Sequence, residues 1–144
     1  MTKASQQFSL IALACGVSLA CAAPSMAATV NLKADLKSSN EVPPNESKGT
    51  GSVTATFDTD SNKLSWKGTV SGLIGTVTAA HFHAAEAGRN GAVACPIIGA
   101  DKDSFEGSVT LTDTQAQDLM AGRWYVNIHT TTHKAGEIRG QLTE

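Results

Sequence analysis

The sequence lacks an excess of positive charge and any concentrated cluster of basic residues. Its 144 residues contain 11 lysines and arginines against 13 aspartates and glutamates, a formal net charge of −2. A nucleic-acid binder needs concentrated lysine and arginine to release the counterions of the phosphates. The composition therefore excludes nucleic acid as a partner.

The sequence also lacks a hydrophobic run that is clearly long enough to span a membrane. The most apolar stretch, residues 8–23, is short for the roughly 20 residues that a spanning helix needs, and polar residues follow it. Lys3 precedes this stretch, and Ser25-Met26-Ala27 has the small residues of a signal peptidase site. We therefore predict an export signal over residues 1–27, cut after Ala27.

The predicted mature domain, residues 28–144, would be periplasmic or extracellular, with no membrane span. It keeps ten basic and thirteen acidic residues, a net charge of −3, because Lys3 alone is lost. Two alternatives concern the N-terminus. Ser18-Leu19-Ala20-Cys21 resembles a bacterial lipobox, which would give a lipid anchor at Cys21, and an uncleaved signal would act as an anchor itself.

Paired cysteines are absent from the mature domain. Cys15 and Cys21 leave with the signal, so Cys95 remains alone and an internal disulfide is excluded. The pattern favours a small buried thiol at this position. A metal ligand or an intermolecular bridge is the alternative.

Recognisable catalytic machinery is missing as well. We find no Ser/His/Asp arrangement, no nucleotide-binding loop and no paired-carboxylate site. The sequence therefore gives no positive indication of an enzyme.

Alternation of apolar and polar residues dominates what is present. In residues 29–36, for example, Val30, Leu32 and Ala34 alternate with polar side chains, as they do in a half-buried strand. Turn residues separate such segments. We predict one all-β domain, an antiparallel Greek-key sandwich of about seven strands at 29–36, 51–58, the segment around 64–66, 76–83, 104–111, 123–130 and 137–142.

One short helix is predicted to interrupt this pattern. Thr112 and Gln115 fit a capping box, Leu111, Leu119 and Met120 would dock the helix, and Gly122 would end it. Two loops also stand out. Residues 40–44 contain consecutive prolines and cannot be regular, and residues 84–92 contain Asn90-Gly91, a tight-turn signal.

The four histidines of the chain fall into two pairs. His81 and His83 lie two apart in a predicted strand and therefore project from the same face, with Phe82 on the other face. In the strand 123–130, His129 points away from the apolar face. If the two strands are neighbours, these three imidazoles converge outside the core, and His133, in the following turn, folds back over them.

Such a set suits a metal ion. Neutral imidazole nitrogens fit Cu(II) or Zn(II), whereas Ca²⁺ and Mg²⁺ prefer oxygen. Glu86, in the loop 84–92, is a candidate oxygen ligand or simply a solvated charge. The alternative for the histidines is that each hydrogen-bonds a neighbouring carbonyl and binds nothing.

Four ordered motifs resemble those of the CHRD domain, a family named from chordin, a secreted antagonist of bone morphogenetic proteins. The motifs are Asn40-Glu41-Val42-Pro43-Pro44, Ala80-His81-Phe82-His83, Tyr125-Val126-Asn127-Ile128-His129-Thr130 and Gly136-Glu137-Ile138-Arg139-Gly140-Gln141-Leu142. The resemblance implies an immunoglobulin-like sandwich or barrel with limited similarity to Cu,Zn superoxide dismutase. That enzyme also binds copper through an H-x-H pair, which His81 and His83 match, and His129 could match a late-strand ligand.

The sequence also departs from these patterns. The dismutase needs more ligands than four histidines and an intrasubunit disulfide that Cys95 alone cannot form. Lys134 stands where the CHRD pattern commonly has proline, and His133 lies at a variable position. Glu137 and Arg139 share a strand face, which predicts a cross-strand ion pair, with a ligand-binding arginine as the alternative.

The sequence thus supports one leading hypothesis: an exported, non-enzymatic CHRD domain that binds copper or zinc through His81, His83 and His129, assisted by His133. Two alternatives come from other classes. The first is an extracellular module that binds an unknown protein partner without metal, and the second is a dismutase-like oxidoreductase.

Overall fold

The computed structural model of the chain describes residues 28–144, so the predicted export signal and Cys21 lie outside the described residues. Every strand in this part pairs antiparallel with its neighbours. The eight strands are β1 (Thr29–Lys37), β2 (Thr50–Asp58), β3 (Lys63–Ser71), β4 (Val77–Ala84), β5 (Ala92–Pro96), β6 (Ser104–Thr110), β7 (Trp124–Thr130) and β8 (Ile138–Gln141).

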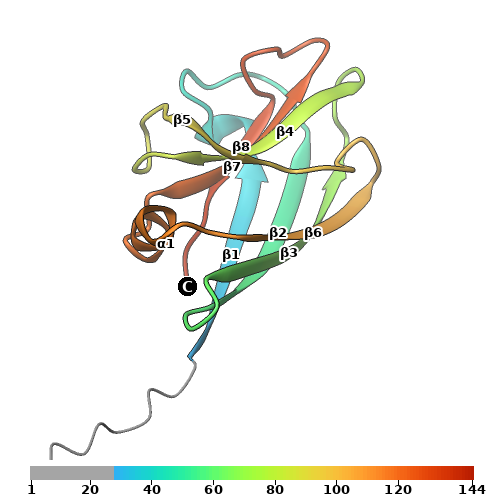
Figure 1. Cartoon of the computed structure of the whole chain (residues 1–144). Helices are drawn as coiled ribbons and strands as arrows, with labels where there is room; N and C mark the ends of the chain where they lie inside the picture. Colours follow the sequence, from blue (N-terminus) through green and yellow to red (C-terminus); the bar gives the residue numbers. More distant parts are fainter. Residues whose placement is uncertain (1–27) are drawn as a thin grey trace, which may run out of the picture.

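The strands form one sheet in the order β5-β4-β7-β8-β1-β2-β3-β6. This sheet is so strongly curled that β4, β5 and β7 lie across the half that contains β1, β2, β3 and β6 (Figure 1). The all-β prediction is confirmed. The predicted sandwich would have two separate sheets, whereas the structure has one continuous sheet. Strand β8 pairs with β7 on one side and with β1 on the other, and so joins the two halves. The sequence prediction also missed β5, whose five residues show no regular alternation.

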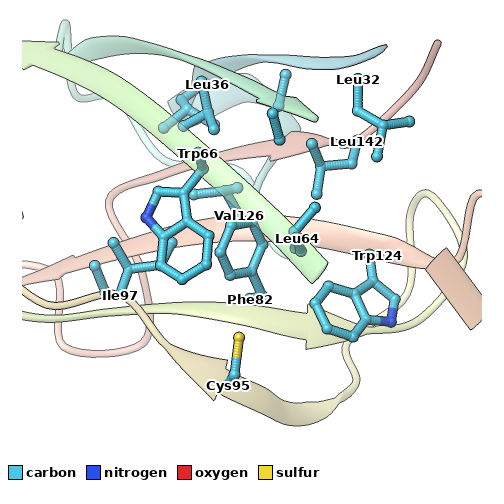
Figure 2. Packing of buried hydrophobic residues seen from close by; sticks show 14 of the residues in the cluster. Leu32, Leu36, Leu64, Trp66, Phe82, Cys95, Ile97, Trp124, Val126 and Leu142 are labelled. Carbon is cyan, nitrogen blue, oxygen red and sulfur yellow. The ribbon is translucent and has the colours of Figure 1, made fainter. Parts of the chain in front are cut away.

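The core fills the inside of the curl. Inward side chains alternate with exposed ones along β1 to β3, as the period-2 pattern predicts. Trp66 of β3 packs edge-on against Phe82 of β4, with ring centroids 5.0 Å apart, and so joins the two halves. Figure 2 shows the sulfur of Cys95 pointing into this core below Phe82. The predicted buried thiol is confirmed, and burial raises the pKa of Cys95 to about 11.

The outward-facing side chains of β7 are buried as well, although an antiparallel sheet can leave one face in contact with solvent. Tyr125 and Asn127 point outward, yet each is only 3% exposed. The segments 38–48 and 84–92 cover them and are tied together by a hydrogen bond from Asn90 Nδ2 to the Val42 carbonyl, 2.9 Å long. A polar layer is therefore enclosed between this part of the sheet and its loops.

The helical segments are short. A 3₁₀ turn, η1, covers Ser38–Asn40, and α1 covers Asp113–Met120 with the predicted capping box at its start. Leu119 docks as predicted, whereas Met120 is 43% exposed and does not. Within residues 28–144, no helix has the length and hydrophobicity to cross a membrane.

Candidate metal centre

Strand pairing brings three histidines onto one outward face. In the antiparallel register of β4 with β7, Ala79 lies opposite His129 and His81 lies opposite Asn127. Because alternate residues share a face, His81, His83 and His129 all point away from the core. The predicted neighbourhood of the two strands is confirmed.

The three imidazoles lie close enough to bind one ion. One nitrogen from each ring lies within 4.8 Å of the others. The ring centroids are 5.2 Å apart for His81 and His129, 5.5 Å for His81 and His83, and 6.0 Å for His83 and His129. In a tetrahedral zinc site with bonds of about 2.0 Å, the ligand nitrogens are about 3.3 Å apart. The nitrogens would therefore have to approach one another by up to about 1.5 Å to bind one ion.

Backbone carbonyls orient two of the rings. Nδ1 of His83 lies 2.9 Å from the Gly91 carbonyl oxygen, and Nδ1 of His129 lies 3.0 Å from that of Lys134. A carbonyl oxygen only accepts, so each Nδ1 donates a proton and each Nε2 keeps its lone pair free. Metal-binding histidines are commonly held in this way.

One further nitrogen in each of the three rings has no hydrogen-bond partner. They are Nδ1 of His81, Nε2 of His83 and Nε2 of His129, and all three are buried. A buried nitrogen without a partner is unfavourable, and each such case requires an explanation. Each of them belongs to one of the three rings that lie within reach of one ion, and a metal ion would give such nitrogens a partner.

The surroundings keep the two histidines of β4 neutral. Burial lowers the pKa of His81, and proximity to His129 and His83 lowers it further. Burial also lowers the pKa of His83, in spite of the hydrogen bond to the Gly91 carbonyl. Both rings therefore carry free lone pairs at neutral pH, which is the form that binds a metal.

An aromatic stack supports His83 from the side. The rings of His83 and Tyr125 are stacked with centroids 4.9 Å apart and planes 7° from parallel. The guanidinium carbon of Arg139 lies 3.5 Å from the centroid of the Tyr125 ring. Tyr125 also accepts a hydrogen bond from the Gly91 N–H through its hydroxyl, so the same residue fixes the loop that holds His83.

Arg139 and Asn90 hold that loop down. Arg139 donates to the Arg89 carbonyl and to Asn90 Oδ1, and it is only 2% exposed. The predicted tight turn at Asn90-Gly91 is wrong: the turn lies three residues earlier, at Ala87-Gly88, and is closed by a hydrogen bond from the Arg89 N–H to the Glu86 carbonyl. Gly88 takes the left-handed backbone conformation there, with φ at +76°, which is a position that glycine adopts without strain.

The predicted ion pair involving Glu137 and Arg139 is also wrong. Across residues 28–144, the one ion pair between side chains joins Arg123 and Asp118. The Glu137 carboxylate is fully buried and accepts hydrogen bonds from the hydroxyls of Ser47 and Thr130 and from the Ile74 N–H. Neutral donors from two loops and from the end of β7, rather than a cation on a neighbouring strand, therefore satisfy this charge.

A second acid lies beside the site. Glu41 is 7% exposed and accepts a hydrogen bond from Asn127, the register partner of His81. Burial raises the pKa of Glu41 to about 7, although the Asn127 hydrogen bond and the Arg139 charge act in the other direction. The sequence placed Glu41 in an irregular loop and gave no sign of its burial.

The remaining predicted ligands lie apart from this group. His133 occupies the turn after β7, where its backbone closes the turn with Thr130. Among the described residues, the group that can hold a metal contains His81, His83 and His129 and neither His133 nor Glu86. The assisting role of His133 stays a prediction.

The comparisons with known proteins agree with the motifs. The profile of the CHRD domain matches residues 32–142, from β1 to just after β8. No curated protein and no solved structure matches the chain. The dismutase-like fold that the resemblance implies therefore stays a prediction, whereas the match over most of the chain shows its family. This chain belongs to the CHRD domain family.

Proposed function

We propose that this CHRD domain binds one copper or zinc ion through His81, His83 and His129, without catalysing a reaction. The observation that supports it is the grouping of three imidazoles within reach of one ion, each of which has a buried nitrogen without a hydrogen-bond partner. Two of these rings are held by backbone carbonyls in the tautomer that leaves Nε2 free. The site therefore needs little reorganisation to receive an ion.

The donor set supports copper or zinc over other metals. All three donors are imidazole nitrogens, and none of the carboxylates in the described part joins the group. Imidazole suits zinc and copper, whereas calcium and magnesium require oxygen ligands. Cys95 belongs to the core on the inner side of the sheet and is no ligand of this site.

We further propose that the domain acts after export, in the periplasm or the extracellular medium. The N-terminal pattern of residues 1–27 supports this proposal. The test is to express the full chain and to determine the N-terminal sequence of the protein in each cell fraction. Recovery of chains beginning at Ala28 outside the cytoplasm is expected, and recovery of the intact chain in the cytoplasm would contradict it.

Calorimetric titration of the purified mature domain tests the metal site. We expect uptake of one copper or zinc ion per chain at pH 7.5, and loss of that uptake in the double variant His81→Ala/His83→Ala. His133→Ala is the matched control, because it removes a histidine outside the group. Equal affinities in the wild type and the double variant would reject the proposal. Loss of binding in the control instead would move the site to the turn after β7.

A further inference from the structure

The group offers three protein ligands and no fourth. Nδ1 of His81, Nε2 of His83 and Nε2 of His129 have essentially no accessible surface, although the rings of His81 and His129 are themselves partly exposed. Among the described residues, no cysteine, aspartate or glutamate lies close enough to add a ligand to these three imidazoles.

The charges around the site favour an ion of low charge. The three ligands of the group are imidazoles, which bind a metal ion in their neutral form. Arg139 adds a buried positive charge, which is linked to His83 through the stacked ring of Tyr125. Its hydrogen-bond acceptors, the Asn90 amide and the Arg89 carbonyl, are neutral. The buried carboxyl of Glu41, which interacts with the charge of Arg139, does not belong to the group.

On the basis of the proposed function, we infer that the ion held at this site is monovalent copper. Zinc is usually four-coordinate in proteins and would take a water or another exchangeable ligand in addition to the three imidazoles. Monovalent copper has a filled d shell and is satisfied by three neutral imidazoles. The cost of burying an ion rises with the square of its charge, so a dication costs about four times as much as a monocation. No carboxylate within the group offsets that cost.

Competition titrations of the wild-type mature domain test this inference. The probes are Cu(I), kept reduced by ascorbate without oxygen and measured with a chromogenic Cu(I) chelator, and Zn(II) and Cu(II), measured with chelators of known affinity. We expect Cu(I) to bind at least 100-fold more tightly than Zn(II) and more tightly than Cu(II). Equal or tighter binding of either dication would overturn the inference and leave the proposed function intact. Binding of none of the three ions would overturn both.

The variant Arg139→Gln tests the electrostatic argument. Loss of the buried charge should raise the ratio of Zn(II) to Cu(I) affinity on the order of 30-fold, as one unit charge acting over about 8 Å at an effective dielectric constant of about 20 would give. A ratio is used because loosening of the loop lowers both affinities together. Arg89→Gln is the matched control, since Arg89 is exposed and should leave the ratio unchanged. An unchanged ratio in Arg139→Gln would contradict the argument.

A second variant keeps the test decisive if Arg139→Gln fails to fold. His81→Asp changes a partly exposed position and places a negative charge within the group. It should reverse the preference, so that Zn(II) binds more tightly than Cu(I). Retention of the Cu(I) preference in this variant would show that charge does not select the ion.

Discussion

The variant Gly91→Ala tests how the loop over β7 controls the site. A Cβ atom at residue 91 would lie 2.0 Å from the Ala84 carbonyl oxygen and 2.8 Å from Cβ of Ala85. The Ala84 carbonyl belongs to the backbone, so rotation of a side chain cannot relieve this clash. The segment around Gly91 must therefore move. That movement breaks two hydrogen bonds, from His83 Nδ1 to the Gly91 carbonyl and from the Gly91 N–H to Tyr125.

The size of the effect follows from those two contacts. Each buried hydrogen bond contributes about 1 kcal/mol, so we expect the free energy of unfolding to fall by about 2 kcal/mol. For a domain of this size that corresponds to a drop in Tm of roughly 8 °C. Loss of the carbonyl that orients His83 should also weaken metal binding by about 10- to 100-fold, the usual effect of removing such a partner.

Gly88→Ala is the matched control, in the same loop. Nothing lies within 4 Å of its added Cβ, but its φ of +76° is unfavourable for alanine and costs about 1 kcal/mol. This variant should lose stability and keep its metal affinity. Thermal unfolding and calorimetric titration of both variants separate the two effects. Equal metal affinities in Gly91→Ala and Gly88→Ala would refute the role given to the Gly91 carbonyl.

Three further predictions concern single groups. The pKa of Glu41 is about 7 in the folded chain, against an ordinary value of 4.5, so the folded state binds more protons than the unfolded state between these two pH values. The stability of the fold therefore falls as the pH rises from 4.5 to 7, by up to about 3 kcal/mol. Glu41→Gln should therefore gain stability over the wild type on going from pH 5 to pH 8 in urea titrations, and a constant difference would contradict this. Cys95 should react with a maleimide at pH 8 only on unfolding, and Cys95→Ala should keep full metal uptake; rapid labelling of the folded domain would show that the thiol is accessible. Long-range ¹⁵N–¹H correlation spectra of the metal-free domain near pH 7.5 should show His83 and His129 protonated at Nδ1, and protonation at Nε2 in either ring would remove the argument for preformed ligands.

The sequence predicted those elements whose formation depends on residues close together in the chain. Alternation identified the strands with one polar and one apolar face, such as β1, and the capping box placed the start of α1. The pleat also put His81 and His83 on one face without any knowledge of the fold. β5 was not predicted because its residues show no regular alternation, and it is recognised only by its pairing with β4.

The parts that depend on packing of distant segments could not be predicted. Arg139 lies in β8 and Glu137 just before it, and segments from elsewhere in the chain bury both and supply neutral partners. Asn90-Gly91 looked like a turn, whereas the glycine is required there by close approach to the Ala84 carbonyl. The Lys134 carbonyl that orients His129 carries no sequence signal, since any residue offers one.

An anomalous difference map from a crystal of the copper-loaded domain, collected at the copper absorption edge, tests the central claim most directly. We predict one strong peak per chain at about 2.0 Å from Nδ1 of His81, Nε2 of His83 and Nε2 of His129. A crystal of the copper-loaded domain with no peak among these three rings, or with its peak on other residues, would contradict the account.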